Sequence, residues 1–180
     1  HDTVRRQRQM CIRDSPFRQS RSQRRTFKRN ADLKVSCGEA SPGSAEQALF
    51  DLHKSRFVEN VPNSLGDFLG AGPEAYPCEC RQFSVYLEGQ LIAVSFMALG
   101  RRSCSGIYAA FDPAFSSRRL GVYTMLAELE FAREYELEFY YIGYATIEPS
   151  CYDYKKQFSS LEYYDWEEQW LRGEDLSKVS

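Results

Sequence analysis

The residues with the clearest chemical potential lie in one stretch, Ser117–Phe131, which reads Ser-Arg-Arg-Leu-Gly-Val-Tyr-Thr-Met-Leu-Ala-Glu-Leu-Glu-Phe. Ser116 and Ser117 are of the type that caps helix N-termini, and the residues after them have the spacing of an amphipathic helix. The preceding segment, Tyr108–Pro113, predicts a strand and its exit turn. A strand that leads into a helix start containing Arg and Gly presents backbone N–H groups and the positive end of the helix dipole to an anionic donor.

This arrangement resembles the way in which acyltransferases of the GNAT type hold an acyl donor. Their usual pattern is Gln or Arg, two residues, Gly, one residue, then Gly or Ala, because small residues let the backbone approach a diphosphate. Arg118 and Gly121 match this pattern, whereas Tyr123 takes the place of the last small residue. Because a phenol there would crowd the diphosphate of coenzyme A, we expect the acyl group to arrive on a different carrier.

Length and charge distribution limit the class of protein. A chain of 180 residues suits one domain with a substantial core. The net charge is −2, yet residues 1–34 hold 11 Lys and Arg against 3 Asp, so a basic arm precedes an acidic body. This distribution indicates a polyanionic partner, nucleic acid first, and the alternative is a solvated basic tail without structure.

The cysteines and the apolar runs bear on the compartment. Six cysteines occur without a signal peptide before them, and no apolar run approaches the length of a transmembrane helix. We therefore expect reduced thiols, a cytoplasmic location and no association with membranes. Cys78-Glu-Cys80 is too tightly spaced for a C-x-x-C metal site, and no second pair or His cluster accompanies it, so no metal site is expected.

Periodicity and turn signals predict the elements that position these residues. Residues 1–15 show neither helical nor strand periodicity, and we interpret them as an artefact of sequence assembly or as disordered. Helices are expected over 45–57, 63–69, 117–135 and 150–158, with His53 packed or at the surface rather than catalytic. Strands are expected over 82–88 and 91–97, joined as a hairpin at Gly89-Gln90, and over 105–111, 138–144 and 161–166. Residues 37–44 are expected to form a loop and residues 173–180 a disordered tail.

The order of these elements predicts the fold class. Helices, antiparallel strands, a helix, a strand, a helix and a strand indicate an α+β fold of the GNAT-like type. Its sheet would be mixed, mostly antiparallel and flanked by helices. We expect the sheet to splay between its central strands, to hold the acyl donor there, and to form a single domain over residues 16–172.

Several short motifs resemble, in sequence order, the aminoacyl-tRNA–protein transferases of the N-degron pathway. These are the arginyltransferases and the bacterial aspartate/glutamate leucyltransferases. The motifs are Ser20–Arg25, Lys28–Leu33, Phe111–Pro113, Arg119–Tyr123, Gly143-Tyr144 and Tyr154-Lys155 with Phe158. The resemblance runs from about Phe17 to Trp170. It implies a GNAT-like domain that moves an aminoacyl group from charged tRNA to the α-amine of a protein with N-terminal Asp or Glu, which marks that protein for degradation.

The resemblance also implies features beyond this chain. Family members carry an N-terminal domain with a cysteine motif implicated in iron–sulfur or metal binding, and this chain has no such motif. We therefore expect a C-terminal part of such an enzyme, without a cofactor of its own, monomeric, and with aminoacyl-tRNA as co-substrate. The leucyltransferase-like form has Trp soon after the Tyr of Gly143-Tyr144 and a Lys-Met pair further on, and neither is present here. Arginine is the expected donor and leucine the alternative.

The chemistry implied by the resemblance assigns roles to residues. Transfer from the activated ester of aminoacyl-tRNA needs a neutral amine, removal of its proton and stabilisation of a tetrahedral oxyanion. The expected catalytic residues are Tyr123, Tyr144 and Tyr154 as proton donors or shuttles, together with Lys155 and Asp112. The expected contacts to aminoacyl-tRNA are the backbone at Leu120 and Gly121, the side chains of Arg118 and Arg119, and the basic residues Arg21, Arg24, Arg25 and Lys28.

Each of these assignments has a structural alternative. Asp112, which precedes a proline, could cap a turn, and Lys155 could be a solvated helix charge. Two other functions also stay open for the whole chain. One is an N-acetyltransferase that uses acetyl-CoA, and the other is an inactive module that binds tRNA or a degron.

Overall fold

The computed structural model of the protein describes residues 7–13, 17–58, 61–70, 78–146, 153–164 and 168–172. The strands within these ranges form one sheet in the order β2-β3-β4-β5-β6-β1-β7-β8. Their bounds are β1 Gln7–Arg13, β2 Lys34–Glu39, β3 Cys80–Leu87, β4 Gln90–Leu99, β5 Ser103–Phe111, β6 Phe139–Thr146, β7 Leu161–Tyr164 and β8 Trp170–Arg172. Neighbouring strands are antiparallel except for β5 and β6, which are parallel.

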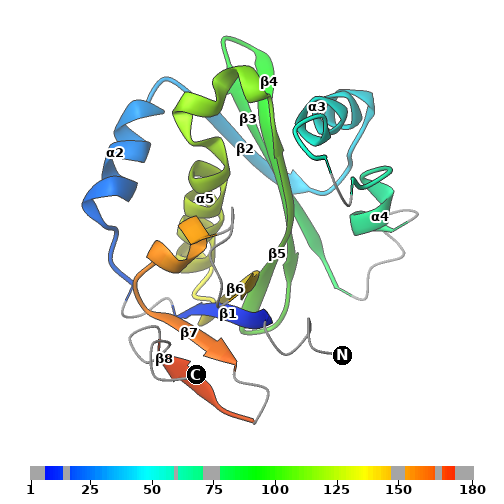
Figure 1. The fold of residues 1–180 in the computed structure, drawn as a ribbon. Coiled ribbons are helices and arrows are strands. Elements are labelled where there is room, and N and C mark those ends of the chain that lie inside the picture. The colour runs from blue at the N-terminus through cyan, green and yellow to red at the C-terminus, as the bar shows by residue number, and fades with distance from the viewer. Residues whose placement is uncertain are drawn as a thin grey trace.

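The helices lie on both faces of this sheet. They are α2 Arg21–Arg29, α3 Ser44–Lys54, α4 Gly66–Leu69 and α5 Leu120–Glu134, with two 3₁₀ helices, η2 Pro113–Arg118 and η3 Asp153–Gln157. Helices α2 and α5 cover one face, whereas α3 and α4 cover the other (Figure 1). This mixed, mostly antiparallel sheet flanked by helices confirms the expected fold class.

The hairpin and the two strands after it follow the sequence expectation. Glu88 and Gly89 form the turn between β3 and β4, one residue earlier than expected, and both have positive φ, 50° and 88°. Glycine suits such a turn because it has no Cβ to clash in the left-handed region. Strands β5 and β6 also lie within two residues of their expected bounds.

The start of the long helix differs from the expectation. Ser116 and Ser117 do not cap it, because they belong to the 3₁₀ helix η2. Arg119 adopts the left-handed conformation (φ 57°, ψ 46°) and separates η2 from α5, which begins at Leu120. Asp112 caps η2 instead, since its side chain accepts a hydrogen bond from the backbone N–H of Ala114.

Three further elements were absent from the sequence-based prediction. Residues 7–13 form strand β1 between β6 and β7, although residues 1–15 show no alternation of polar and apolar side chains. Its central residues, Met10 to Ile12, are buried, and a strand buried on both faces reads as a continuous apolar run rather than an alternating one. Strand β2 replaces the first part of the loop expected over 37–44. Strand β8 ends at Arg172, and residues 173–180 lie outside the described residues.

Helix α2 also went unpredicted, because its buried side is polar. Gln23, Thr26 and Asn30 face inward, so the segment lacks the apolar stripe by which helices are recognised. Its sequence signal is the capping box, in which Ser20 accepts from the N–H of Gln23 and the Gln23 side chain accepts from the N–H of Ser20. Residues 21–29 of the basic arm therefore form an ordered helix.

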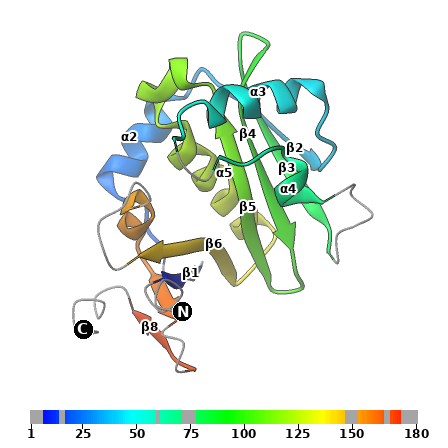
Figure 2. The same ribbon diagram turned by 45° about the vertical axis from the view of Figure 1, so that its right-hand side comes forward.

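The sheet opens between its two parallel strands, as expected. β5 and β6, connected through η2 and α5, pair only where Ser103–Ser105 lie beside Phe139–Tyr141. Strand β5 has a β-bulge at Ile107, where its pairing with Phe96 and Met97 of β4 shifts register. The bulge bends β5 just after Ser105, the last residue of β5 that pairs with β6. Figure 2 shows β6 turned well away from β5 toward their C-terminal ends.

A buried carboxyl group lies where β5 and β6 stop pairing. The Tyr140 hydroxyl of β6 donates a hydrogen bond to Glu128 Oε2 of α5. A Cβ atom at Gly106 of β5 would lie 3.2 Å from that oxygen and 3.3 Å from the Tyr140 oxygen, so the glycine leaves room for both. Burial raises the pKa of Glu128 to about 7, whereas the nearby Ser95 hydroxyl, the hydrogen bond from Tyr140 and the charge of Lys155 oppose this shift.

We predict that Glu128 makes the protein less stable as pH rises. Its pKa is about 7 in the folded chain against an ordinary 4.5, so the folded state keeps a proton that the unfolded state has lost. The free energy of unfolding therefore falls as pH increases from 4.5 to 7. The Glu128→Gln variant has no group that titrates at this position, so its free energy of unfolding does not fall for this reason. Relative to wild type, its free energy of unfolding should rise by roughly 3 kcal/mol across this range. Urea unfolding of both proteins at the two ends of the range measures the change.

His53 changes the free energy of unfolding with pH in the opposite direction. For this reason the prediction compares Glu128→Gln with wild type. Burial, and then the charge of Arg56, lower the pKa of His53 from 6.5 to about 4, so its neutral form stabilises the folded chain above pH 6.5 and this stability is lost toward pH 4. Both proteins share this contribution, which cancels when they are compared. A stability difference that stays constant with pH would contradict a neutral buried Glu128.

Candidate functional site

The start of α5 lies at the C-terminal end of β5. The backbone N–H groups of Val122 and Tyr123 donate to the Arg119 carbonyl oxygen, each at 3.0 Å. The N–H groups of Leu120 and Gly121 come before the first intrahelical hydrogen bonds, and no side chain caps the helix. Leu120 is buried, whereas Gly121 is partly exposed. The reachable helix-start donor is therefore the N–H of Gly121.

The two arginines before this helix hold it against α2. Arg118 makes a two-pronged contact with the Asp32 carboxylate, at 2.8 and 2.9 Å, and its guanidinium lowers the pKa of that carboxyl. Its carbonyl oxygen accepts a hydrogen bond from the Asn30 side chain at 3.0 Å. Arg119 donates to Ser22 Oγ at 2.6 Å. Both side chains expected to bind phosphate or a carboxylate are thus engaged within the protein.

Tyr123 does not line an open cleft. Its side chain is 6% exposed and packs edge-on against Phe27 of α2, with ring centroids 5.7 Å apart. The surrounding cluster includes Leu33, Val85 and Ile92, and burial raises the pKa of the phenol. The expected exclusion of coenzyme A by this ring is therefore wrong, because tertiary packing turns the ring into the core under α2.

Asp112 has the structural role that its position before a proline suggested. Its Oδ1 accepts from Ala114 N at 2.9 Å and caps η2. This contact fixes the turn by which the chain leaves β5 and enters η2. The side chain thus positions the segment that precedes α5.

The other side of the opening is formed by β6 and η3. Lys155 Nζ donates to the Ile142 carbonyl oxygen at 2.8 Å and lies 3.4 Å from the position of a Cβ at Gly143. Gly143 has φ 85°, which favours glycine, and Tyr144 beside it is 50% exposed. Tyr154 is half-buried against the main core. Lys155 therefore lies beside Gly143 of β6, Tyr144 is the next residue of that strand, and Tyr154 precedes Lys155 in η3.

On the opposite face of the sheet, α3 contacts the end of β5 through His53. The side chain is buried, which decides between the packed and the surface position expected for it, and its Nδ1 atom lies 3.0 Å from the backbone N and 3.1 Å from the backbone O of Phe111. Arg56 donates to His53 Nε2 at 3.1 Å, and its guanidinium lies 4.5 Å from the centre of the Phe111 ring. Sequence reasoning missed Arg56, because a single basic residue after a helix carries no pattern.

The basic residues of α2 face solvent. Arg21, Arg24, Arg25 and Lys28 are exposed, and none of them forms an ion pair with a carboxylate in the described part of the chain. An exposed row of cations without anionic partners attracts polyanions. Helix α2 thus presents to solvent a positive surface, which we call the α2 basic surface, made of these residues.

Other kinds of site are less well supported. Across the described ranges, no three His, Cys, Asp or Glu side chains gather as metal ligands, and no helix is long and apolar enough to cross a membrane. A surface hollow of about 500 Å³ lies at the opposite end of β5, lined by Cys78, Glu79, Leu99, Gly100, Arg101, Tyr135 and Leu137. Its lining includes none of the residues that sequence reasoning selected.

Solved structures share this fold at low sequence identity. The C-terminal DUF2156 domain of an Agrobacterium fabrum protein is 15% identical, with a TM-score of 0.59 over 77% of this chain and 46% of that chain. FemX is 10% identical, with a TM-score of 0.57 over 82% of this chain and 55% of that chain. These similarities show that the fold is GNAT-like.

Curated relatives are more similar in sequence. The aspartate/glutamate leucyltransferase of Hahella chejuensis is 33% identical over 135 residues, which are 71% of this chain and 56% of that protein. The protein of the same name from Stenotrophomonas maltophilia is 32% identical over 162 residues, 83% of this chain and 62% of that protein. The chain therefore spans less than two thirds of the length of these relatives.

The family comparison covers most of the chain. The model described as "Arginine-tRNA-protein transferase, C terminus" matches residues 20–165. This range begins at the cap of α2 and includes both sides of the opening between β5 and β6. Together with the GNAT-like sheet and the resemblance of its motifs, the match shows that the chain belongs to the family of the arginine-tRNA-protein transferase C terminus.

Proposed function

We propose that the chain transfers an aminoacyl group from aminoacyl-tRNA to the α-amine of proteins that begin with Asp or Glu. Membership of the family over residues 20–165 carries this proposal. The relatives are named aspartate/glutamate leucyltransferases, and from these names we infer an acceptor that begins with Asp or Glu. The donor stays a prediction, because the family description names arginine whereas the names of the relatives favour leucine.

The reaction needs no further source of energy, because the ester of aminoacyl-tRNA is already activated. The amine nitrogen forms a bond to the acyl carbon, and the bond from that carbon to the ribose oxygen breaks. The amine loses one proton, and the ribose oxygen gains one. The protein must therefore hold the ester beside the amine, stabilise the intermediate oxyanion and accommodate these protons.

The opening between β5 and β6 supports this chemistry. The N–H of Gly121 at the start of α5 is suited to the oxyanion or to a phosphate of the tRNA 3′ end. Tyr144, Tyr154 and Lys155 on the β6 side are the proposed proton-handling groups. Because Tyr123 is buried, it does not distinguish coenzyme A from tRNA, and the preference for tRNA rests on the family and on the α2 basic surface.

The same proposal includes a cellular role. Addition of a residue to an acidic N-terminus would mark the acceptor protein for degradation. We place the reaction in the cytoplasm, where charged tRNA is made and used.

We predict that the purified chain labels acidic peptides. With tRNA charged with radioactive leucine or arginine, a peptide that begins with Asp or Glu should become labelled with one of the two amino acids. Acid-precipitable label and mass spectrometry of the peptide measure the product. The matched control is the same peptide with an acetylated N-terminus, which has no free amine and should stay unlabelled.

The assay also has an acetyl-CoA arm. Acetylation of the peptide from acetyl-CoA, without transfer from either charged tRNA, would replace this proposal with an N-acetyltransferase. Binding of tRNA without transfer from any donor would instead favour an inactive binding module.

We predict that the α2 basic surface makes tRNA binding dependent on salt. Replacing Arg21, Arg24, Arg25 and Lys28 by Gln should weaken binding and flatten the plot of log K against log salt concentration by roughly 0.7–0.9 per lost phosphate contact. Fluorescence anisotropy of labelled tRNA from 50 to about 300 mM salt measures the slope. The matched control replaces four cations, Arg13, Arg102, Arg133 and Lys156, by Gln, because these cations already pair with carboxylates. Equal slopes for both variants would show that the α2 basic surface makes no specific contribution to tRNA binding.

A further inference from the structure

An acceptor that begins with Asp or Glu brings a carboxylate, and the site needs a cation to recognise it. Arg118 is occupied by the Asp32 carboxylate, and Arg119 contacts Ser22. Both contacts tie the start of α5 to α2. Lys155 donates to the Ile142 carbonyl oxygen and is among the proposed proton-handling groups. A cation on another element near the end of β5 is therefore the better candidate.

Arg56 is such a cation. It follows α3, and its guanidinium lies 4.5 Å from the centre of the Phe111 ring, within the range of a cation–π contact. Its Nη2 donates to His53 Nε2 at 3.1 Å, and its Nε lies 3.3 Å from the His53 carbonyl oxygen. The residue is exposed, and no carboxylate lies within 4 Å of it among the described residues. A guanidinium fixed in this way can meet a carboxylate at small entropic cost.

His53 keeps this cation in place. Arg56 can only donate hydrogen bonds, so His53 Nε2 must accept, and the ring must be neutral. Burial and the nearby guanidinium both lower the pKa of His53, to about 4, and the ring therefore stays neutral at physiological pH. The pair is a stable donor and acceptor rather than two competing positive charges.

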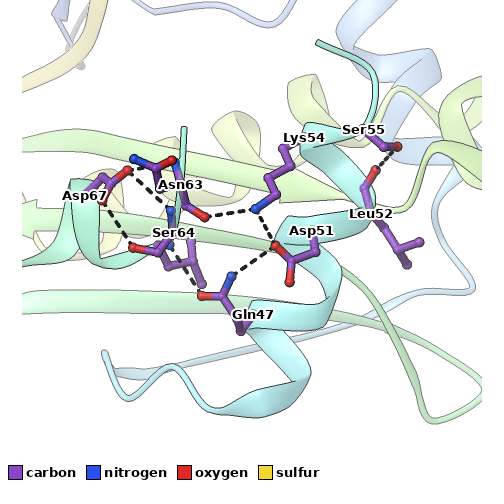
Figure 3. Close-up of polar contacts among 9 residues, drawn as sticks. Gln47, Asp51, Leu52, Lys54, Ser55, Asn63, Ser64 and Asp67 are labelled. Carbon is purple, nitrogen blue, oxygen red and sulfur yellow. Dashed lines mark hydrogen bonds and ion pairs between the residues drawn. The ribbon is translucent and has the colours of Figure 1, made fainter. Parts of the chain in front are cut away.

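Arg56 lies two residues after the end of α3. Polar contacts with the segment around α4, drawn in Figure 3, fix this end of the helix. Lys54 Nζ pairs with the Asp51 carboxylate at 2.7 Å and donates to the Asn63 carbonyl oxygen at 2.9 Å. Asp67 in turn accepts from the N–H of Asn63 at 2.8 Å. These contacts hold the C-terminal turn of α3 without using Arg56.

Phe111 connects Arg56 to the proposed donor site. The guanidinium covers the Phe111 ring, and a Cβ at Gly121 would lie 3.5 Å from Cε1 of the same ring. A group bound at the N–H of Gly121 and a group bound at Arg56 are therefore separated by one aromatic ring. This spacing suits an acyl carbon at the start of α5 and the side chain of the residue that attacks it.

We propose that Arg56 recognises the side-chain carboxylate of the acceptor's N-terminal Asp or Glu and so determines acceptor specificity. The inference rests on the proposed function and adds the residue responsible. Arg56 touches the acceptor and takes no part in proton transfer. Its role thus differs from that of the groups on β6.

Peptide binding tests this assignment independently of catalysis. Two peptides that differ only in an N-terminal Asp or Asn are titrated by calorimetry into wild type, Arg56→Gln, Arg56→Lys and Arg102→Gln. Wild type and Arg102→Gln, whose altered arginine pairs with Glu138 at the other end of β5, should prefer Asp. Arg56→Gln should lose about 10- to 100-fold in affinity for the Asp peptide alone, and Arg56→Lys should lose less.

The outcomes separate a binding role from a packing role. If Arg56 only packs on Phe111, Arg56→Gln will weaken both peptides equally or lower the thermal midpoint without changing the preference, and the proposal fails. Equal binding of both peptides by wild type overturns it as well. Transfer from charged tRNA is measured in parallel. If wild type transfers the aminoacyl group and Arg56→Gln keeps the preference for Asp, the assignment of Arg56 is rejected and the proposed reaction stands. If the protein binds the Asp peptide selectively but transfers nothing, the proposed reaction is rejected.

Discussion

The parting of β5 and β6 is the constraint on which this structure depends. Two strands that separate inside a sheet leave a space between them and backbone groups that need partners. Here Glu128 and Tyr140 occupy the core at that place, and Gly106 has no side chain to compete with them. Lys155 supplies a hydrogen bond to the Ile142 carbonyl oxygen beyond the last β5–β6 pair. The opening is therefore built into the packing of the core.

The cost of this arrangement is a carboxyl group kept in an apolar environment. Burial raises the pKa of Glu128 to about 7, which means that its neutral form is the one that the core accommodates best. A neutral carboxyl can both donate and accept, and so it can satisfy polar groups from more than one strand. This suits a position at which α5 faces β4, β5 and β6 together. A hydrocarbon side chain there would leave the Tyr140 hydroxyl without this acceptor.

The two faces of the sheet carry different tasks in the proposed reaction. Helix α2 is joined to the start of α5 through Arg118 and Asp32, so the α2 basic surface and the Gly121 N–H belong to one connected unit. Helix α3 reaches the end of β5 from the other face through His53. A tRNA on the first face and a protein N-terminus on the second could then meet at the end of β5.

The site was predictable only in part, and particular residues show why. Lys155 and Tyr144 belong to short motifs, and the structure places Lys155 beside Gly143 of β6, while the catalytic role of both residues stays a prediction. Tyr123 was misjudged, because a helical position says nothing about which neighbour will cover it, and Phe27 of α2 does so. Arg56 and Glu128 carried no signal. One is a single charge after a helix, and the other is a glutamate within a helix whose hydrogen-bond partner, Tyr140, lies on a later strand.

Local chemistry along the chain by itself determined the hairpin with Gly89, the strand before the long helix, the helix over most of its length and the motifs that indicate its family. These features depend on neighbours within a few residues, and the chain therefore records them directly. Tertiary structure alone decided that a basic segment with a polar inner side becomes α2, that Arg118 is paired with Asp32, and that His53 and Phe111 hold Arg56 beside the end of β5. The contacts of Arg118 with Asp32 and of Arg56 with Phe111 join residues far apart in the chain, and they exist only once the sheet brings its strands together.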